Sequence, residues 1–380
     1  MSVVVIESIY LHEVEMPLVE PLRTSFGVDD VRRVILVEAR AGDLVGWGEC
    51  VAGDEPGYSY ETVETARHVM TRFLLPALVG QQVASAADAR RLMAGVRGHP
   101  LAKAAVEGAI WELLARARGM ALADMLWERY PLNAPRRNRV VVGVSIGIQP
   151  TIDDTLAIIE KRLKEGYRRI KLKIAPGWDV DLAAAVRSAY PDIMLMLDAN
   201  SAYTLDDAEH LKKLDRFNLL MLEQPLGHDD IYEHSKLQPQ LETPICLDES
   251  IRCANDVRLA LELGACRIIN LKPPRVSGLD EACAVHKVCY DEGVPLWIGG
   301  MLETGVGRAQ NVAVASLPGV TLPSDISATN RYYNPDVADP PFVLNAEDST
   351  LDVPSAVGTG VTVNRAWIDE ADRRWHFSAP

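Results

Sequence analysis

Five apolar runs in the second half of the chain end in charged residues at nearly constant spacing. In order they are Lys173 in IKLKI, Asp198 in MLMLDAN, Glu223 in LLMLEQP, Asp248 in ICLDES and Lys272 in IINLKPP. Successive members lie 25, 25, 25 and 24 residues apart. One strand, one crossover helix and two short loops need about this many residues, so the spacing is typical of a parallel (β/α) barrel. It predicts that the five side chains lie at similar heights around the carboxyl-terminal mouth of that barrel.

The rest of residues 131–341 agrees with a modified (β/α)8-type TIM barrel. Short runs rich in Val, Ile and Leu alternate with helical segments such as Thr151–Glu165 and Ala254–Leu263, as expected for strands buried on both faces. Because Pro323–Pro341 is loop-rich where the last helix would stand, the expected architecture is (β/α)7β. The expected strands are Val140–Ile146, Arg169–Ile174, Ile193–Leu197, Leu219–Leu222, Ile245–Leu247, Arg267–Leu271, Pro295–Ile298 and Val320–Leu322.

The first part of the chain shows a different, α+β pattern. Val3–His12 and Val34–Ala39 are predicted to be strands, with the polar segment Pro21–Asp30 as a loop between them. Leu101–Met120 is rich in Ala, Leu, Glu and Arg and carries apolar residues three and four apart, which predicts a helix. Strands followed by a helical block indicate a module separate from the barrel.

We therefore expect two domains. Residues 1–130 form an α+β capping domain, and residues 131–341 form the barrel that carries the charged residues. The linker-like segment Pro131–Asn138 marks the boundary. The tail over residues 342–380 is too short to fold alone and is expected to complete the capping domain.

The strand order predicts where the charged residues lie. Lys173 is on the second strand and Lys272 on the sixth, so the two lysines face each other from opposite walls of an eight-stranded barrel. Asp198, Glu223 and Asp248 lie between them, and three acidic groups this close cannot all ionise without compensation. Any one of them alone is commonly a helix N-cap or a salt-bridge partner, but three at a fixed period are not explained that way. Ligation by oxygen alone is typical of a hard divalent cation, so we expect Mg²⁺, with Mn²⁺ as the alternative.

A cation between two opposed lysines predicts a particular chemistry. The cation can bind a substrate carboxylate and stabilise the enediolate that forms when the α-carbon loses its proton. With one lysine on each face of that carbon, removal on one side and return on the other inverts the centre, which is racemisation. With a β-leaving group the same site would eliminate it, as in a dehydratase or a cycloisomerase. The expected partner is a small-molecule carboxylate.

The composition excludes several other classes. Lys and Arg number 39 against 53 Asp and Glu, a formal net charge of −14, so no basic stripe is present for nucleic acid. No stretch reaches the ~18 apolar residues of a membrane span, and the N-terminus lacks the basic region of a signal peptide. The six cysteines show neither CxxC pairs nor zinc-finger spacing, so they are expected to be reduced thiols of a cytoplasmic protein.

Several motifs are similar to those of the enolase superfamily. They are KLKIAPGWD at 171–179, LDAN at 197–200, LEQPL at 222–226, CLDES at 246–250, NLKPPRVSG at 270–278 and GGMLETGVGR at 299–308. The likeness extends from MPLVEPLRTSFG at 16–27 and GWGEC at 46–50 to LPSDISATNRYY at 322–333. Within the superfamily the chain most resembles the N-succinylamino acid racemase / o-succinylbenzoate synthase group of the muconate-lactonizing branch. The resemblance implies a Mg²⁺-dependent racemase of N-acylated amino acids, a synthase of o-succinylbenzoate in menaquinone biosynthesis, or both. It also implies a homo-oligomer, because dimers and octamers are usual in this group.

The resemblance further implies roles for individual residues. Asp198, Glu223 and Asp248 would be the metal ligands, and Lys173 and Lys272 the acid/base pair. In the synthase reaction Lys173 would abstract the proton, and the ammonium group of Lys272 would stabilise the enediolate.

Other residues are expected to contact or support the substrate. Lys171 would support Lys173, and Arg275 matches an arginine associated with racemase-capable members. For Arg275 a plain surface residue remains the alternative, and for Ser145 and Asn200 a cap residue does. Two loops of the N-terminal module, around Leu22–Phe26 and Gly53–Tyr58, are expected to shape the substrate pocket. The remaining expected contacts are Leu22, Phe26, Met301, Leu302 and Asp325.

Three alternative functions stay open. Muconate cycloisomerases share the lysine and metal scaffold. Dipeptide epimerases hold a substrate ammonium with a DxD pair near the eighth strand, of which Asp325 remains while Ser327 replaces the second acid. The third is a phosphate-binding barrel, since the glycines between residues 299 and 307 lie where barrels often bind phosphate, or an inactive metal-binding scaffold.

Overall fold

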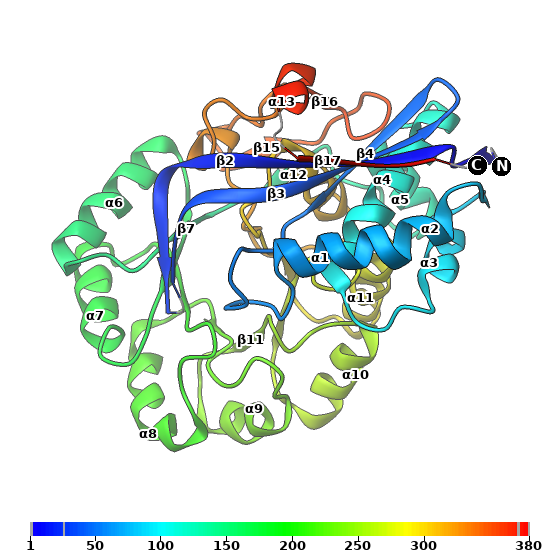
Figure 1. The fold of residues 1–380 in the computed structure, drawn as a ribbon. Coiled ribbons are helices and arrows are strands. Elements are labelled where there is room, and N and C mark those ends of the chain that lie inside the picture. Colours follow the sequence, from blue (N-terminus) through cyan, green and yellow to red (C-terminus); the bar gives the residue numbers. More distant parts are fainter. Residues whose placement is uncertain (1–2, 26, 371–372, 379–380) are drawn as a thin grey trace.

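Seven parallel strands form the centre of the larger part of the molecule. The computed structural model describes residues 3–25, 27–370 and 373–378, and within them these strands follow one another around a curled sheet in chain order. The helices between the strands lie on the outside of the sheet (Figure 1). The strands are β7 (Val144–Ile146), β8 (Arg169–Lys173), β9 (Met194–Asp198), β10 (Leu222–Glu223), β11 (Ile245–Leu247), β12 (Ile268–Leu271) and β13 (Leu296–Ile298). The helices are α6 (Ile152–Glu165), α7 (Val180–Ala189), α8 (Ala208–Leu211), α9 (Tyr232–Leu237), α10 (Ala254–Leu263), α11 (Leu279–Glu292) and α12 (Gly305–Ala315). The predicted modified barrel is confirmed.

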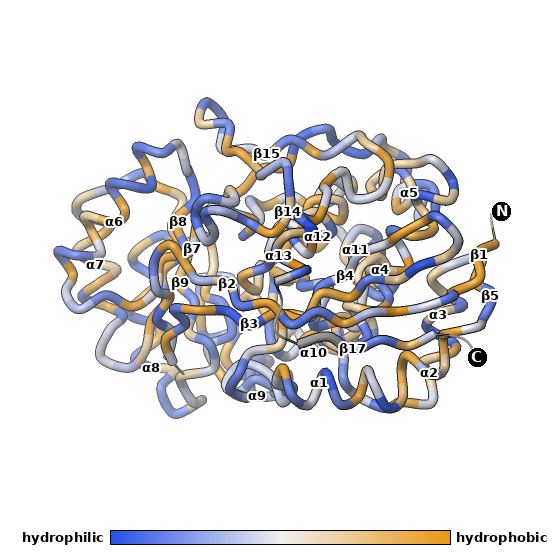
Figure 2. Tube along the Cα trace, turned by 45° about the horizontal axis from the view of Figure 1, so that its top comes forward, coloured by the Kyte–Doolittle hydropathy of each residue, from blue (hydrophilic) through white to orange (hydrophobic). Residues whose placement is uncertain are grey.

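Local sequence explains where these elements begin and end. Every residue of β8 is buried, as expected for a strand covered on both faces. The hydroxyl of Thr151 accepts a hydrogen bond from the backbone N–H of Asp154, which caps the start of α6. That helix ends at Gly166 in the left-handed conformation, which costs glycine little. Figure 2 shows hydrophobic and hydrophilic segments alternating along α6 and α7, as expected for helices with one face on a sheet.

The prediction of a regular eighth strand over residues 320–322 is wrong. This segment forms isolated parallel bridges on its two sides, from Val320 to β13 and from Ser324 to the residues that precede β7. Pro323 lies between these bridges and has no backbone N–H, so it cannot continue a ladder of hydrogen bonds. The barrel therefore closes through single bridges.

The first predicted barrel strand, Val140–Ile146, is divided in two. Its first part is β6 (Arg139–Val141), which pairs antiparallel with β15 (Thr350–Asp352) from the C-terminal tail. The barrel strand β7 begins only at Val144. A Cβ on Gly143, between the two parts, would lie 2.3 Å from the side chain of Arg169, so a larger residue has no room there.

A four-stranded antiparallel sheet, in the order β17–β2–β3–β4, forms the core of the N-terminal part. The prediction of a loop over Pro21–Asp30 is wrong, because β2 and β3 stay paired as far as Thr24 and Gly27. Most residues of this arm are exposed, so it lacks the alternating apolar pattern by which a strand is recognised. In Figure 1 the arm bends away from the sheet toward the barrel strands. The strands are β2 (Ser8–Thr24), β3 (Gly27–Ala41), β4 (Leu44–Cys50) and β17 (Arg373–Ser378).

Helix α4 (Pro100–Arg118) packs against β4 at very close range and agrees with the predicted helix Leu101–Met120. A Cβ on Gly48 would lie 1.9 Å from the carbonyl oxygen of Ala105, and one on Gly46 would lie 2.2 Å from that of Ala109. Glycine at both positions lets the helix backbone approach the strand backbone. The other helices of this part are α1 (Val63–Val69), a π-helical turn (Met70–Leu74), α2 (Leu75–Leu78), α3 (Ala86–Met93) and α5 (Leu122–Arg129).

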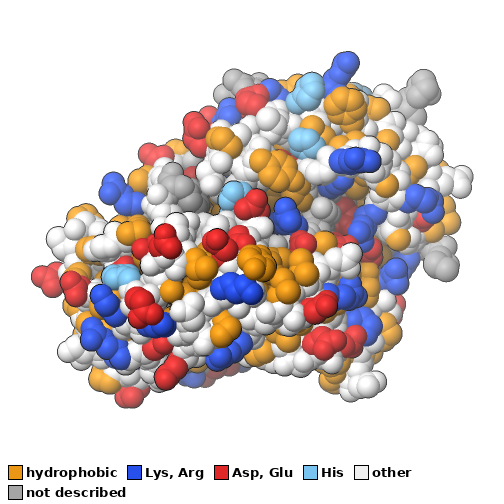
Figure 3. Space-filling view, turned by 90° about the horizontal axis from the view of Figure 1, so that it is seen from below, with side chains coloured by type: hydrophobic (Ala, Val, Ile, Leu, Met, Phe, Trp, Pro, Cys, Tyr) orange, Lys and Arg blue, Asp and Glu red, His pale blue; other side chains and the backbone are white. Residues whose placement is uncertain are grey.

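The C-terminal tail returns to the N-terminal sheet, where β17 pairs antiparallel with β2. The shorter elements of the chain are β1 (Val4–Val5) with β5 (Gln82–Val83), β14 (Ala338–Asp339) with β16 (Thr362–Val363), and α13 (Arg365–Glu370). The exact division into domains at residue 130 stays a prediction. Within the described ranges, no helix is both long enough and apolar enough to cross a membrane. Figure 3 shows Lys and Arg interspersed with Asp and Glu on one face of the molecule.

Substitution of Gly48 by alanine should lower the free energy of unfolding by about 2–3 kcal/mol, because the added methyl group meets the backbone of α4. Urea unfolding followed by circular dichroism measures this loss. Gly95→Ala is the matched control, since open space surrounds Gly95, and it should change the stability by less than about 0.5 kcal/mol. Equal stabilities of the two variants would contradict the close-packing argument.

Candidate active site

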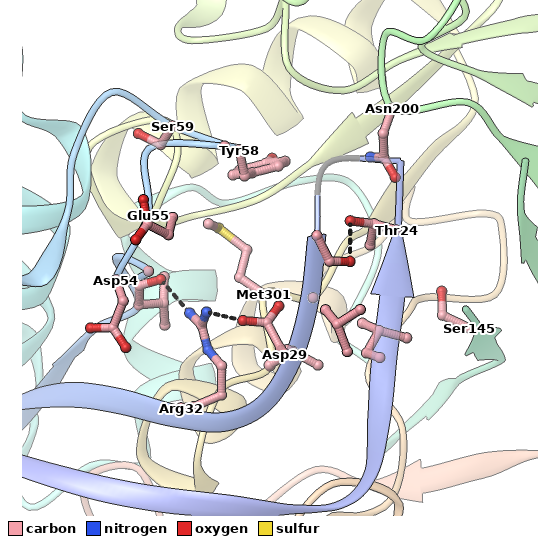
Figure 4. A pocket seen from close by; sticks show the side chains of 18 of the residues that line it. Thr24, Asp29, Arg32, Asp54, Glu55, Tyr58, Ser59, Ser145, Asn200 and Met301 are labelled. Atoms are coloured by element: carbon pink, nitrogen blue, oxygen red, sulfur yellow. Dashed lines mark hydrogen bonds and ion pairs between the residues drawn. The ribbon is translucent and has the colours of Figure 1, made fainter. Parts of the chain in front are cut away.

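A cavity of about 330 Å³ lies between the barrel mouth and the β2–β3 arm. On the barrel side it is lined by Lys171 and Lys173 of β8 and by Lys272, which follows β12. On the other side it is lined by β2, β3 and the loop over residues 53–59. In the view of Figure 4, the side chain of Met301 lies between Tyr58 and Asp29. Of the predicted substrate contacts, Phe26 lies outside the described residues; those that line the cavity, besides Lys171 and Met301, are Leu22, Ser145, Asn200, Leu302 and Asp325.

The three predicted metal ligands lie on neighbouring strands at one end of the barrel. Asp198 ends β9 and is paired in register with Glu223 on β10, and Asp248 directly follows β11. All three residues are at most 1% exposed. The carboxyl ends of parallel barrel strands are where enzymes of this architecture hold their reacting groups.

Each of these carboxylates has a positively charged partner. The ammonium group of Lys173 donates to Asp198 at 2.7 Å, and that of Lys272 donates to Asp248 at 2.9 Å. The Nζ atom of Lys171 lies 3.2 Å from an oxygen of Asp198 and 3.2 Å from an oxygen of Glu223. The two predicted acid/base lysines therefore pair with opposite ends of the row of carboxylates, and both face the same cavity.

The carboxylates differ in their tendency to hold a proton. Burial and the neighbouring charge of Asp198 raise the pKa of Glu223 to about 8. Burial acts in the same direction on Asp198 and Asp248, but their cationic partners hold the pKa of each carboxyl below its usual range. Burial works to lower the pKa of Lys272, yet Asp248, Tyr58 and Glu249 together more than offset this and raise it. The row is therefore short of positive charge at Glu223 and well neutralised at both ends.

The donor set fits a hard divalent cation. Its oxygens come from carboxylates alone, and neither histidine nor cysteine is among the described residues that line the cavity. Next to Asp248, one buried oxygen of Glu249 finds no hydrogen-bond partner in the described part of the chain. Across the described ranges, no three acidic, histidine or cysteine side chains converge as a ready ligand set. In the structure two of the predicted ligands are instead joined by lysine, since Lys171 bridges Asp198 and Glu223.

The structure adds two residues that the sequence analysis did not single out. The side-chain amide of Asn270 donates to Glu223 at 2.7 Å. The hydroxyl of Tyr58, from the predicted pocket loop, accepts from Lys272 at 3.0 Å and donates to Asp248 at 3.3 Å. Asn270 could have been found as the polar residue inside the apolar run IINL. Nothing in the sequence indicates the contact of Tyr58, which joins residues far apart in the chain.

Arg275 contacts Asp248 from outside the cavity. Its guanidinium group pairs with Asp248 and donates to the backbone carbonyl groups of Ile251, at 2.7 Å, and Asn270, at 2.6 Å. Arg275 is buried but is not among the residues that line the cavity. Its contacts are those of a residue that orients Asp248.

Asp325 belongs to a second buried charge cluster. It accepts a hydrogen bond from the hydroxyl of Ser145 at 2.7 Å, and it pairs with Lys171 at 3.0 Å and with Arg169 at 3.3 Å. Asn200, on the other side of β8, accepts from Lys173 at 2.6 Å. Ser145 and Asn200 thus fix neighbouring groups of the site.

Comparison with known proteins shows the family of the chain. Residues 154–367 match the family model "Enolase C-terminal domain-like", and residues 6–126 match "Mandelate racemase / muconate lactonizing enzyme, N-terminal domain". An o-succinylbenzoate synthase from Geobacillus kaustophilus is 48% identical over 365 residues, which cover 96% of this chain and 95% of the relative. An N-succinylamino acid racemase from Thermus thermophilus is 44% identical over 364 residues, 96% of each chain. The crystal structure of an enolase superfamily member from Listeria innocua matches with a TM-score of 0.92 at 37% identity, over 99% of both chains. The chain is therefore an enzyme of the enolase superfamily, whose mandelate racemase and muconate-lactonizing members generally use a divalent metal ion.

Proposed function

We propose that this enzyme removes the α-proton of a carboxylate substrate and acts as an N-succinylamino acid racemase, an o-succinylbenzoate synthase, or both. The observation that carries the proposal is the pair of buried lysines on one cavity, Lys173 at the end of β8 and Lys272 after β12. Four strand positions separate β8 from β12 around the sheet. Relatives with each of the two names are 44–48% identical over nearly the full chain.

Mg²⁺ is the cation of this proposal, and Asp198, Glu223 and Asp248 would hold it. When bound, a divalent cation supplies Lewis-acid stabilisation of the negative charge that develops on the substrate carboxylate. The buried position of all three carboxylates supports this choice, because excluding water strengthens the attraction between opposite charges.

The two lysines would carry the proton. In racemisation one of them takes the α-proton from one face of the substrate, and the other delivers a proton to the opposite face. In the synthase reaction Lys173 takes the proton, and the ammonium group of Lys272 stabilises the enediolate electrostatically. Lys171 pairs with Asp198, Glu223 and Asp325 and so keeps the charged groups around Lys173 in place.

The contacts of Asp325 argue against a dipeptide epimerase. A substrate ammonium group would need a free carboxylate, whereas Asp325 is already paired with Lys171 and Arg169. An N-acylated substrate has no such ammonium group. A muconate cycloisomerase would use the same lysines, and no observation favours it.

A cytoplasmic location and a homo-oligomeric state are part of the proposal. All six cysteines lie in the described ranges, none forms a disulfide, and five of them are buried. Free buried thiols are typical of proteins in a reducing compartment.

Incubation with N-succinyl-L-phenylalanine and Mg²⁺ in D₂O should place deuterium on the α-carbon and convert the substrate to a mixture of enantiomers. Proton NMR and chiral chromatography measure the two changes. A parallel incubation with EDTA is the control. The proposal would be refuted by the absence of both α-deuterium exchange and dehydration of the o-succinylbenzoate precursor.

Lys173→Ala and Lys272→Ala should each lower the rate of racemisation by about 10²–10⁴-fold, because each removes one of the two groups that transfer the proton. Calorimetric titration with Mg²⁺ should show that both variants still bind the metal. Lys287→Ala is the matched control, since this lysine is exposed on α11 and pairs with Asp291. Substantial racemisation by either active-site variant would disprove the two-lysine assignment.

Added Mg²⁺ should raise the melting temperature more at pH 8 than at pH 6. The pKa of Glu223 is raised from 4.5 to about 8, so without metal this group stabilises the fold most at low pH. That contribution is lost as the pH rises from about 4.5 through about 8. Metal binding requires the ionised carboxylate and is therefore favoured over the same range. At a metal concentration 100 times the Kd, the expected stabilisation is about 2.7 kcal/mol.

Glu223→Gln is the control for that experiment. It should remove most of the stabilisation by Mg²⁺ and flatten the pH dependence relative to the unsubstituted protein. Other buried carboxyls, among them Glu107, also titrate with raised pKa values, so the difference between the two proteins is the quantity to compare. An identical Mg²⁺ response in both proteins would argue against Glu223 as a ligand.

A further inference from the structure

The cavity has a second cationic group, far in the sequence from the lysines of the barrel. Arg32 lies on β3, is 8% exposed, and lines the cavity from the side of the N-terminal arm (Figure 4). Its Nη1 donates to Asp29 at 3.2 Å, and its Nη2 donates to the backbone carbonyl of Val51 at 2.9 Å. Its Nε is buried without a hydrogen-bond partner in the described part of the chain. Arginine has five N–H groups, so this side chain has donors left for an anion.

The proposed substrates need two cationic sites. An N-succinylamino acid and the precursor that is dehydrated to o-succinylbenzoate each carry one carboxylate near the reacting carbon and a second at the end of the succinyl group. The first would lie at the barrel end of the cavity, among the lysines and their carboxylate partners. Enclosing the second without a positive partner would be strongly unfavourable, because a buried charge loses its hydration.

Four positively charged side chains occur among the described residues that line the cavity: Lys171, Lys173, Lys272 and Arg32. The three lysines are committed to the carboxylates of the barrel strands. Arg32 comes from the opposite wall, and its acidic partner Asp29 has a side chain that is 36% exposed. An ion pair with an exposed partner is weak, so a second carboxylate can compete with Asp29 for the guanidinium group.

We propose that Arg32 binds the carboxylate at the far end of the succinyl arm and thereby selects succinylated substrates. This inference rests on the proposed function. A planar guanidinium group matches a carboxylate with two parallel hydrogen bonds, which lysine cannot do. Asp29 then acts as a competitor that occupies Arg32 until the substrate arrives.

The test compares N-succinyl-phenylalanine with N-acetyl-phenylalanine, which keeps the amide but lacks the second carboxylate. In Arg32→Gln the ratio of kcat/KM for the succinyl substrate to that for the acetyl substrate should fall about ten- to a hundred-fold, the value of a charged hydrogen bond. Arg32→Lys should give an intermediate ratio. Arg33→Gln is the matched control, because the neighbouring Arg33 pairs with Asp54 and Glu13 and does not line the cavity. Its ratio should equal that of the unsubstituted enzyme.

Asp29→Asn provides an independent test, since it removes the carboxylate that competes for the guanidinium group and keeps Arg32. It should raise the succinyl-to-acetyl ratio. An equal loss on both substrates in Arg32→Gln would overturn the inference and leave Arg32 as a structural link between Asp29 and Val51. If Arg32→Gln does not fold, an unchanged ratio in Asp29→Asn would overturn it.

The failure of the proposed function would look different. An unsubstituted enzyme that turns over neither substrate would contradict the proposed racemase activity. The binding of o-succinylbenzoate, measured by calorimetry with Mg²⁺ present, then decides the role of Arg32. Its affinity should be about ten- to a hundred-fold weaker in Arg32→Gln than in the unsubstituted enzyme. Equal affinities would overturn the inference.

Discussion

Three carboxylates buried side by side on neighbouring strands are the constraint on which the rest of the site depends. An unpaired buried charge costs several kcal/mol, so the fold must supply cations within hydrogen-bond reach. It does so with side chains that also face the cavity or back onto it: Lys171, Lys173, Lys272 and Arg275. Two of these groups, Lys173 and Lys272, are also the ones to which the proposed function assigns the transfer of the proton. A divalent cation held by the acids would take over part of this neutralisation.

A second set of buried carboxylates joins the N-terminal part to the barrel. Glu49 on β4 accepts hydrogen bonds from the backbone N–H groups of Thr304 and Gly307 at the start of α12, at 2.9 and 2.8 Å. Glu107 on α4 accepts from the first N–H groups of α11. Negative charge is favourable at a helix N-terminus, although burial raises the pKa of Glu49 to about 7 and that of Glu107 to about 8. These contacts fix the part of the chain that carries the β2–β3 arm over the barrel mouth.

The barrel and its row of charged residues could be predicted because they depend on local rules. A strand buried on both faces is an unbroken apolar run, and a polar residue at its end stands out at a regular interval. The β2–β3 arm escaped prediction because its side chains are mostly exposed and lack the alternating apolar pattern of a strand. Backbone pairing and ion pairs, such as that of Glu20 with Arg162, hold it in place. The eighth strand is irregular because Pro323 lacks a backbone N–H. Whether that missing donor interrupts the strand depends on which strands lie beside it, and the sequence does not show this. The contacts of Tyr58 and Arg169 depend on how distant segments meet, which no local pattern encodes.

The two walls of the cavity obey different constraints. The barrel wall carries the interlocked charges, so a change at one of them disturbs the pairing of several others. The opposite wall is built from an exposed two-stranded arm and a loop. Tyr58 of that loop contacts Lys272 and Asp248, whereas Leu22 and Arg32 lie outside the charged pairs of the barrel. Substitutions there can change what the cavity accepts at little cost to the charge balance of the reacting groups. Leu22 and Arg32 lie on that wall. Their position fits a division in which the barrel carries the reacting groups and the arm selects substrates by their shape and charge.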